Sequence, residues 1–315
     1  MNTFFLDRLN SEPHALAFAG QSTPWPVALA DQSANPALDE ALHTHAAAAQ
    51  ALLYPVSAEL LATTGRPVDL FGFEPNPARL GAAAAASASV PGIALTQLGA
   101  LLDAAALGYN PAQAKPVAVL GHSQGVLAVH MVQAICEAGS IDAAAAKIDE
   151  ILAIATLIGV AGTRQARQLG LAARHGEATP MLSVKDITRA QVDALIERVD
   201  GARGPIAVAV TNSATHYVLS GYPEDLAAFG VEVAKEHKRQ AKLREEKVRG
   251  GRVFGPTLEY LDVTLPFHSP LMADAVSQAV AWAEACGINA DHARELAAEV
   301  LLNHVDSVSY THLRA

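Results

Sequence analysis

The stretch Pro116–Val129 constrains the fold more than any other part of the chain. It begins with a short apolar run, passes through Gly-His-Ser-Gln-Gly at residues 121–125, and continues with apolar residues at helical spacing. Strand, sharp turn and helix, with a serine at the apex, is the context that a Gly-x-Ser-x-Gly nucleophile elbow requires. We therefore expect Ser123 at the carboxyl edge of a sheet, with the backbone N–H of Gln124 at a helix N-terminus where an oxyanion could form.

Composition excludes several classes of protein. The chain has 315 residues, 51% of them hydrophobic and 17% charged, so it can bury a large core in one or two domains. Its net charge of −10 argues against nucleic acid as the main partner. Two cysteines, with no Cys/His pair at zinc spacing, predict neither a disulfide framework nor a metal site. The longest apolar run, 151–162, is too short to span a bilayer, so we expect a cytoplasmic protein without membrane contact.

The first half of the chain alternates apolar strands with helical patterns. We expect a buried strand at 14–19, a loop-rich segment at 66–91, and helices at about 37–64 (interrupted by Pro55), 95–107 and 141–158. This alternation predicts an α/β fold, with an α/β-hydrolase-like core that holds a parallel sheet and the nucleophile elbow.

The pattern changes after residue 179. A strand at 180–184, a helix capped by Thr188, strands at 206–210 and 216–220, a helix from Pro223 and a strand near Val263 follow one another. This is the split βαβ order of a ferredoxin-like unit. We therefore expect a core at 1–178 and 255–305, an inserted ferredoxin-like subdomain at 179–254, and a tail at 306–315 that is unrelated to the fold.

A serine nucleophile needs a base, which in elbow enzymes follows the serine in the chain. The histidines after Ser123 are His130, His175, His216, His237, His268, His292, His304 and His312. His130 lies too far along the elbow helix, and His216 opens a strand, which is more typical of a structural histidine. His268 ends an apolar strand just before a helix, where sites gather. From this residue alone, the better interpretation is a structural loop histidine whose hydrogen bonds are satisfied.

Four motifs occur in the order found in the malonyl/acyl-CoA:acyl carrier protein transacylase family, which the chain resembles from about Ala15 to Val305. They are Gly20-Gln21 after the first strand, Gly121-His122-Ser123-Gln124-Gly125, Asn212 before Val218-Leu219-Ser220-Gly221, and Pro266-Phe267-His268-Ser269. The Gln124 form of the elbow, with the stretches 157–160 and 180–183, looks most like the acetyltransferase domain of microbial type I fatty acid synthase.

The resemblance implies an acyltransferase that moves an acetyl or other short acyl group from CoA to the phosphopantetheine thiol of an acyl carrier protein, priming fatty acid synthesis. No bound cofactor is implied, and the carrier would be a domain of the same multienzyme. Ser123 would form an acyl-serine intermediate, His268 would be the general base, and the backbone N–H groups of Gln21 and Gln124 would form the oxyanion hole. The residues implied to bind substrate are His122, Ile158 and Asn212.

One position at which this chain differs from its malonyl-specific relatives predicts which acyl group it carries. Malonyl-specific relatives carry an arginine just before the glycine at Gly159, where this chain has Ile158, so a neutral pocket for acetyl is expected. Three alternatives remain: a malonyl-CoA transacylase of the same fold, a serine hydrolase (thioesterase or esterase), and a non-catalytic domain kept for assembly. The hydrolase would need an acid between Ser123 and His268 and a motif such as His-Gly-Gly-Gly, which the sequence lacks.

Overall fold

The computed structural model describes residues 8–21, 24–70, 85–171, 178–199, 201–246 and 255–302, so the predicted tail at 306–315 lies outside the described residues. The strands are β1 (Ala15–Phe18), β2 (Ala118–Gly121), β3 (Met181–Lys185), β4 (Ala207–Ser213), β5 (His216–Ser220) and β6 (Thr257–Tyr260). The helices are α2 (Trp25–Ser33), α3 (Pro36–Leu52), α4 (Ser57–Thr64), α6 (Ala86–Ala106), α7 (Pro111–Ala114), α8 (Val126–Ala138), α9 (Ala145–Gln168), α10 (Arg189–Ile196), α11 (Pro223–Glu246), α12 (Ala273–Ala285) and α13 (Ala290–Leu301), with short 3-10 turns η1 (Tyr54–Val56), η3 (Ser123–Gly125) and η4 (Pro270–Met272).

Contacts divide the chain into two compact units. The first contains the residues up to Arg164 together with Ala275–Val300, and the second contains Gln165–Asp274 together with residues 301–302. The second unit is wider than the subdomain expected at 179–254, because its last strand, β6, begins after residue 254 and pairs with β3.

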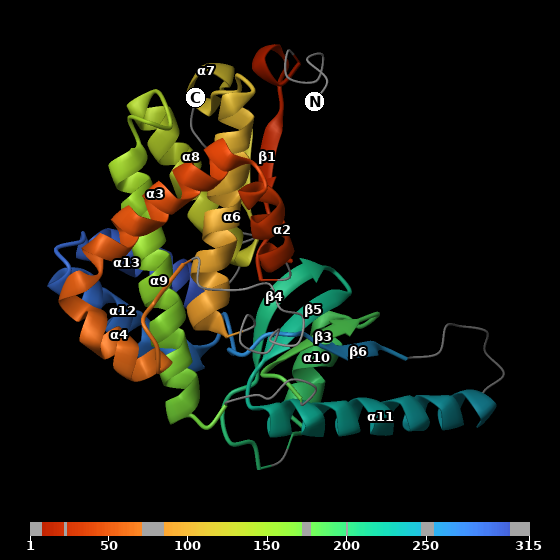
Figure 1. Ribbon diagram of the computed structural model, residues 1–315. Coiled ribbons are helices and arrows are strands. Elements are labelled where there is room, and N and C mark those ends of the chain that lie inside the picture. The colour runs from red at the N-terminus through yellow and green to blue at the C-terminus, as the bar shows by residue number, and fades with distance from the viewer. Residues whose placement is uncertain are drawn as a thin grey trace. The chain divides into compact units, whose positions relative to one another are not determined.

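The first unit holds a parallel strand pair among helices. β1 pairs with β2 in parallel, from Ala15 opposite Ala118 to Phe18 opposite Gly121, and α8 packs against both strands. The order strand, helices, strand, helix can be followed from red to yellow-green in Figure 1. Parallel strands connected through helices define the α/β class, which confirms the fold class predicted from the sequence.

Helix α6 is the central helix of this unit. It packs against α2, α3 and α8, and every residue from Val90 to Gly99 is buried. It is long and apolar enough to cross a membrane by length and composition alone, but 72% of its most apolar window is buried inside the fold, as in the core helix of a globular protein. The predicted start at residue 95 is wrong: the helix begins at Ala86 and contains Pro91, which lies in the segment predicted to be a loop.

Two other predicted helices differ from the observed ones. The helical segment at 37–64 is interrupted at Pro55, as expected, by the 3-10 turn η1 between α3 and α4. The helix expected at 141–158 is in fact α9, which ends ten residues later at Gln168. Gly159 does not end it, because its missing side chain lets α9 approach α6: a Cβ there would lie 2.4 Å from the carbonyl oxygen of Ala86.

The second unit has the predicted ferredoxin-like topology. Its strands form one antiparallel sheet in the order β4-β5-β3-β6, with α10 connecting β3 to β4 and α11 connecting β5 to β6. Thr188 caps α10 in a capping box with Gln191, as the sequence predicted. The strand expected near Val263 is wrong in position, because the residues that pair with β3 are Thr257–Tyr260.

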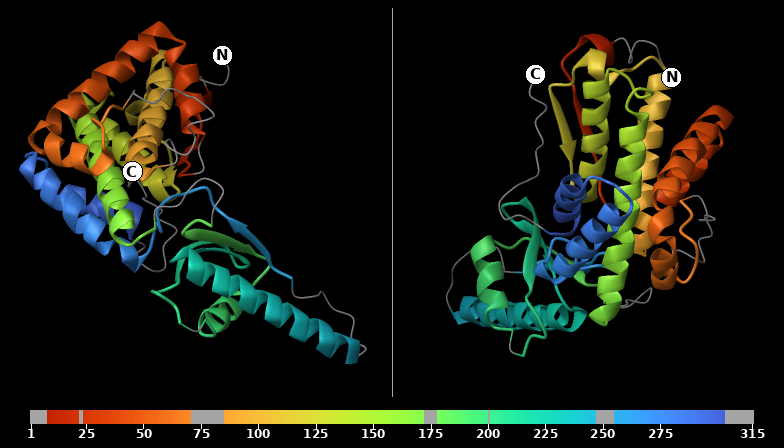
Figure 2. Two further views of the ribbon diagram at one scale, coloured as in Figure 1. Left: turned by 60° about the horizontal axis from the view of Figure 1, so that its bottom comes forward. Right: turned by 90° about the vertical axis from the view of Figure 1, so that its left-hand side faces the viewer.

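One face of this sheet forms the core of the second unit. The buried set is Leu182, Val184, Tyr217 and Leu219 from the strands with Val192, Leu195, Leu226, Phe229 and Val233 from α10 and α11. Figure 2 shows both helices on the same side of the strands. Since side chains alternate along a strand, Ser183, Lys185 and His216 lie on the opposite face.

Candidate active site

The serine elbow forms as the sequence predicts. β2 ends at Gly121, and the 3-10 turn Ser123–Gly125 leads directly into α8. Ser123 has φ +54°, in the left-handed region that residues with a side chain rarely occupy. Ser123 is half-buried and His122 is exposed. The strained serine is therefore accessible at the apex, and such strain clusters at functional sites.

Two glycines make this tight turn possible. A Cβ at Gly121 would lie 2.5 Å from the backbone nitrogen of Val126, and one at Gly125 would lie 2.3 Å from the carbonyl oxygen of Phe18 at the end of β1. The elbow therefore packs backbone to backbone against itself and against β1.

The loop after β1 lies beside the serine. A Cβ at Gly20 would lie 2.7 Å from the carbonyl oxygen of His122 and 3.1 Å from the Cβ of Ser123. Gln21 Nε2 donates to Gln124 Oε1 at 2.5 Å. The structure thus brings together Gln21, Ser123 and Gln124, which the resemblance had placed in one site. Whether their N–H groups form an oxyanion hole stays a prediction.

Helix α6 supports this arrangement through two buried glutamines. Gln124 is fully buried, and its Nε2 donates to the carbonyl oxygen of Val90 at 2.5 Å. Gln97, also buried, donates from Nε2 to the carbonyl oxygen of Ala19 at 2.7 Å, just before the Gly20-Gln21 loop. The sequence analysis missed this support, although Gln97, a lone amide in an apolar stretch, was its visible signal.

Ile158 lies on α9 and is fully buried. Its neighbour Gly159 contacts Ala86 on α6, and Ser87 N donates to Thr163 Oγ1 at 3.0 Å one turn further on. The segment that carries Ile158 and the side chain of Gln124 therefore both contact the first turns of α6, between residues 86 and 90.

His268 belongs to the second unit, in the segment before η4. It is 6% exposed and has φ +56°, so it too has a left-handed backbone. Ser269 N donates to the carbonyl oxygen of Leu301 at 3.3 Å, and the Ser269 hydroxyl accepts from Leu271 N at 3.2 Å. These bonds hold the histidine segment in place. Its pairing with Ser123, which lies in the first unit, stays a prediction.

Asn212 lies near the end of β4 and is exposed. Its Nδ2 is 3.4 Å from His216 Nε2, which is also 3.0 Å from the hydroxyl of Ser183. Burial, and then the positive charge of Lys185, lower the pKa of His216 below its usual value. His216 was predicted to be structural, and its contact with Asn212 was not foreseen.

One group of side chains in the described residues could hold a metal ion. His130 of α8 and Glu295 and Glu299 of α13 offer ligand atoms that all lie within 4.8 Å of one another. His130 Nε2 is already 3.3 Å from Glu299 Oε2, and Glu295 is exposed. The group lies where these two helices of the first unit meet.

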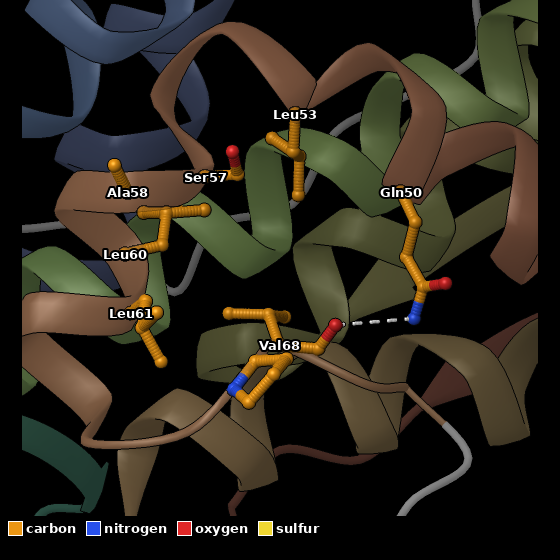
Figure 3. A pocket seen from close by; sticks show the side chains of 8 residues that line it. Gln50, Leu53, Ser57, Ala58, Leu60, Leu61 and Val68 are labelled. Carbon is orange, nitrogen blue, oxygen red and sulfur yellow. Dashed lines mark hydrogen bonds between the residues drawn. The ribbon is translucent and has the colours of Figure 1, made fainter.

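The first unit also contains an apolar cavity of about 410 Å³ between α3, α4 and the segment that follows α4 (Figure 3). It is lined by Gln50, Leu53, Ser57, Ala58, Leu60, Leu61, Pro67 and Val68. Gln50 Nε2 donates to the carbonyl oxygen of Val68, and Ser57 Oγ donates to that of Tyr54. The lining holds no titratable group, so this cavity has no means of activating a nucleophile.

The fold and the elbow define an α/β chain with a serine nucleophile motif and a ferredoxin-like unit, and the comparisons identify which proteins share it. Residues 180–260 match the family model described as the fatty acid synthase central AT domain. Curated relatives include the fatty acid synthase subunit beta of Schizosaccharomyces pombe, 27% identical over 209 residues, which are 60% of this chain and 10% of that protein. Fatty acid synthase 2 of Mycosarcoma maydis is 30% identical over 175 residues, 52% of this chain and 5% of that protein.

Solved structures agree on the fold. The malonyl CoA-acyl carrier protein transacylase of Coxiella burnetii is 16% identical with a TM-score of 0.55, covering 93% of this chain and 80% of that one. A malonyl-transacylase solved in complex with a type II polyketide synthase acyl-carrier protein is 17% identical with a TM-score of 0.56. The match covers 93% of this chain and 82% of that one. At these identities the likeness establishes the architecture. With the family match, it confirms the resemblance to the acyltransferase domain of fatty acid synthase. The chain spans a tenth or less of the length of these curated relatives.

Proposed function

We propose that this chain is an acyltransferase domain that carries a short acyl group from a CoA thioester to the phosphopantetheine thiol of an acyl carrier protein, as in fatty acid synthesis. The main supporting observation is Ser123, held at φ +54° at the apex of the elbow beside the Gly20-Gln21 loop. A nucleophile fixed next to two backbone segments that can present N–H groups is the arrangement that acyl transfer needs.

In the first half-reaction, Ser123 Oγ attacks the thioester carbon while His268 accepts the hydroxyl proton. The carbonyl oxygen becomes an oxyanion, which we assign to the backbone N–H groups of Gln21 and Gln124. The C–S bond then breaks, His268 returns the proton to the CoA thiolate, and an acyl-Ser123 ester remains. His122 and Asn212 would contact the substrate.

In the second half-reaction, the carrier thiol replaces CoA. His268 takes the thiol proton, the sulfur attacks the ester carbon, and the C–O bond to Ser123 breaks with return of the proton to the serine. No cofactor takes part, because every electron pair and proton in both steps comes from the serine, the histidine and the thiols. Acyl-CoA and the carrier are supplied in the cytoplasm, where we propose that the chain works, and Cys136 and Cys286 are free thiols.

We further propose that the acyl group is acetyl or another short saturated chain. Ile158 stands where an arginine would be needed to pair with a malonyl carboxylate, and the described side chain is fully buried and apolar. A malonyl transacylase of the same fold is the main alternative.

Intact-protein mass spectrometry tests the proposal directly. Incubation with acetyl-CoA should add one acetyl group that maps to Ser123. Ser123→Ala should abolish labelling, and His268→Ala should slow it by about 10²-fold, the lower range of general base catalysis. Ser57→Ala, which changes an exposed serine on α4, is the matched control. An acetyl group mapped to another residue would overturn the mechanism.

The same protein distinguishes a transferase from a serine hydrolase. With a pantetheine thiol present, acyl transfer to the thiol should exceed the release of free acid. If free acid is released at the same rate with and without the thiol acceptor, the result would favour a serine hydrolase.

A further inference from the structure

Three side chains of the kinds that bind metal ions meet between two helices of the first unit. His130 of α8 and Glu295 and Glu299 of α13 offer one ligand atom each, and these atoms all lie within 4.8 Å of one another. His130 Nε2 is 3.3 Å from Glu299 Oε2, which is longer than the about 2.7–2.9 Å of a good charge-assisted hydrogen bond. The direct contact between the two groups is therefore weak.

The helices place these groups so that one ion can reach all three. Glu295 and Glu299 are one helical turn apart, so their carboxylates lie on the same face of α13. The imidazole of His130 lies beside that of His292, with ring centroids 5.5 Å apart. His292 is itself held by α9, because its Nδ1 is 3.0 Å from Glu150 Oε1. The half-buried ring of His130 is therefore held in position by its neighbours.

The group carries more negative charge than its surroundings balance. Among the residues that the structure describes, Glu299 pairs with His130 alone, and Glu295 has no ion-pair partner. Two carboxylates one turn apart on a helix repel each other. Lys147 of α9 does not relieve this repulsion, because its Nζ lies 2.7 Å from Glu150 Oε1 and its charge is balanced there. A divalent cation would balance the two carboxylates.

The ligand atoms select the kind of ion. Mg²⁺ and Ca²⁺ take oxygen ligands, whereas an imidazole combined with carboxylates suits zinc. Zinc bonds of about 2.0–2.2 Å place tetrahedral ligand atoms roughly 3.3–3.6 Å apart, so the widest separation here has to close by at most about 1.5 Å. Glu295 is exposed, so its flexible side chain can make that movement and a water molecule can supply a fourth ligand.

We propose that His130, Glu295 and Glu299 form a zinc site, with water as the fourth ligand, that joins α8 to α13. Because α8 begins directly after the elbow turn, the ion fixes the helix that supports Ser123. Neither half-reaction of the proposed function involves the ion, so the two proposals stand or fall separately. The sequence analysis predicted no metal site, because these ligands come from helices far apart in the chain and no short Cys/His spacing marks them.

The experiment titrates zinc chloride into the full chain, without an affinity tag and after treatment with a chelator, and follows binding by isothermal titration calorimetry. One equivalent should bind. Glu295→Gln and Glu299→Gln should each raise the Kd by about 100-fold or more, because even the loss of an outer-shell partner costs about 10–100-fold. Glu295 is exposed, so its variant should fold as the wild type does. An excess of Mg²⁺ should not compete with zinc.

His43→Gln is the matched control. It removes a surface histidine whose Nδ1 lies 3.4 Å from Asp39 Oδ1, one turn away on α3, and it should leave the one-equivalent site unchanged. In the wild type, zinc at 100 times its Kd should raise the Tm by about 5 °C. At the same zinc concentration, Glu295→Gln should lose most of this rise.

Three results would overturn the inference. The first is a wild type that binds no equivalent of zinc. The second is a Kd that Glu295→Gln and Glu299→Gln leave unchanged, which would place the zinc elsewhere on the chain. The third is displacement of zinc by Mg²⁺, which would mean that the imidazole is not a ligand. None of these results bears on whether Ser123 is acylated by acetyl-CoA.

Discussion

Backbone strain at single residues distinguishes the candidate site from its surroundings. Ser123 and His268 both have positive φ, at +54° and +56°, although neither is a glycine. Each lies where an apolar stretch ends and a helical turn begins. Such a conformation costs about 1–3 kcal/mol and persists only where the surrounding packing enforces it. For Ser123 that packing comes from glycines whose missing side chains let backbones meet.

We therefore predict that Gly125→Ala disrupts the elbow. The added methyl would lie 2.3 Å from the carbonyl oxygen of Phe18 and 3.0 Å from that of Ala19, and backbone atoms cannot yield as a flexible side chain can. Overpacking of this kind costs about 1–3 kcal/mol. Urea denaturation should show a loss in that range, and acylation of Ser123 should fall by more than about tenfold.

Gly230→Ala on α11 is the matched control. A Cβ there meets only Leu258 Cδ1 at 3.5 Å, and alanine favours a helix interior by about 0.5–1 kcal/mol over glycine. Gly230→Ala should leave the free energy of unfolding equal to that of the wild type or higher. Acylation of Gly125→Ala at the wild-type rate would contradict the prediction and mean that the elbow tolerates a rearranged β1.

At this scale the sequence predicted which residues meet around the elbow, but not how they are held. Gln21, Ser123 and Gln124 could be grouped because a motif specifies them and local backbone geometry brings them to a strand edge. The bonds from Gln124 to Val90 and from Gln97 to Ala19 could not, because they depend on where α6 packs. The same holds for the contacts of His216 with Ser183 and Asn212, which depend on how β3, β5 and β4 pair.

Among the elements, errors occurred where tertiary packing overrides local signals. Pro91 and Gly159 are both poor residues for a helix interior, so the sequence predicts a helix boundary near each. Both lie inside helices, because α6 is buried on nearly every side and because Gly159 allows α9 to approach α6. The ferredoxin-like order was predictable because alternating strands and a capped helix are local patterns. The position of its last strand depended on pairing with β3.

The contact between α11 and the segment after α10 gives a prediction about acid stability. Glu236 is 7% exposed and accepts from Arg239 Nη2 at 2.6 Å, from Gln240 Nε2 at 2.8 Å and from Arg198 Nη1 at 3.0 Å. The bond from Arg239, then those from Gln240 and Arg198, lower the pKa of Glu236 to about 2. An unfolded glutamate titrates near ~4.3, so the folded state favours the ionised form.

Its stabilisation is therefore fully present above that unfolded pKa and is lost as the pH falls toward about 2. We expect the urea midpoint of the wild type to fall more steeply between pH 5 and 2 than that of Glu236→Gln. At pH 7 the variant should already be less stable. Glu224→Gln changes an exposed partner of Arg203, and its urea midpoint should depend on pH as that of the wild type does. Parallel curves for wild type and Glu236→Gln would refute the assignment.

For the molecule as a whole, the acyl group is the property that the sequence and the fold constrain least directly. A malonyl carboxylate inside an apolar pocket needs a cation. The nearest basic residues on either side of Ile158 in the sequence are Lys147 and Arg164. In the structure, the side chains of both basic residues contact other residues. Arg164 donates to Gln278 at 2.8 Å and lies 5.9 Å over the ring of Trp282, and Lys147 lies 2.7 Å from Glu150.

We therefore predict that acetyl-CoA exceeds malonyl-CoA in kcat/KM by about 30-fold or more. An unpaired buried carboxylate costs about 2–5 kcal/mol, and each 1.4 kcal/mol is about tenfold. Ile158→Arg should narrow or invert the ratio by supplying the missing partner. Because this places a charge at a fully buried position, circular dichroism must show that the variant folds, and Ile158→Met serves as a neutral control of similar volume. The measurement is kcat/KM for both thioesters with each protein, and comparable values in the wild type would make this a malonyl or dual-specificity transferase.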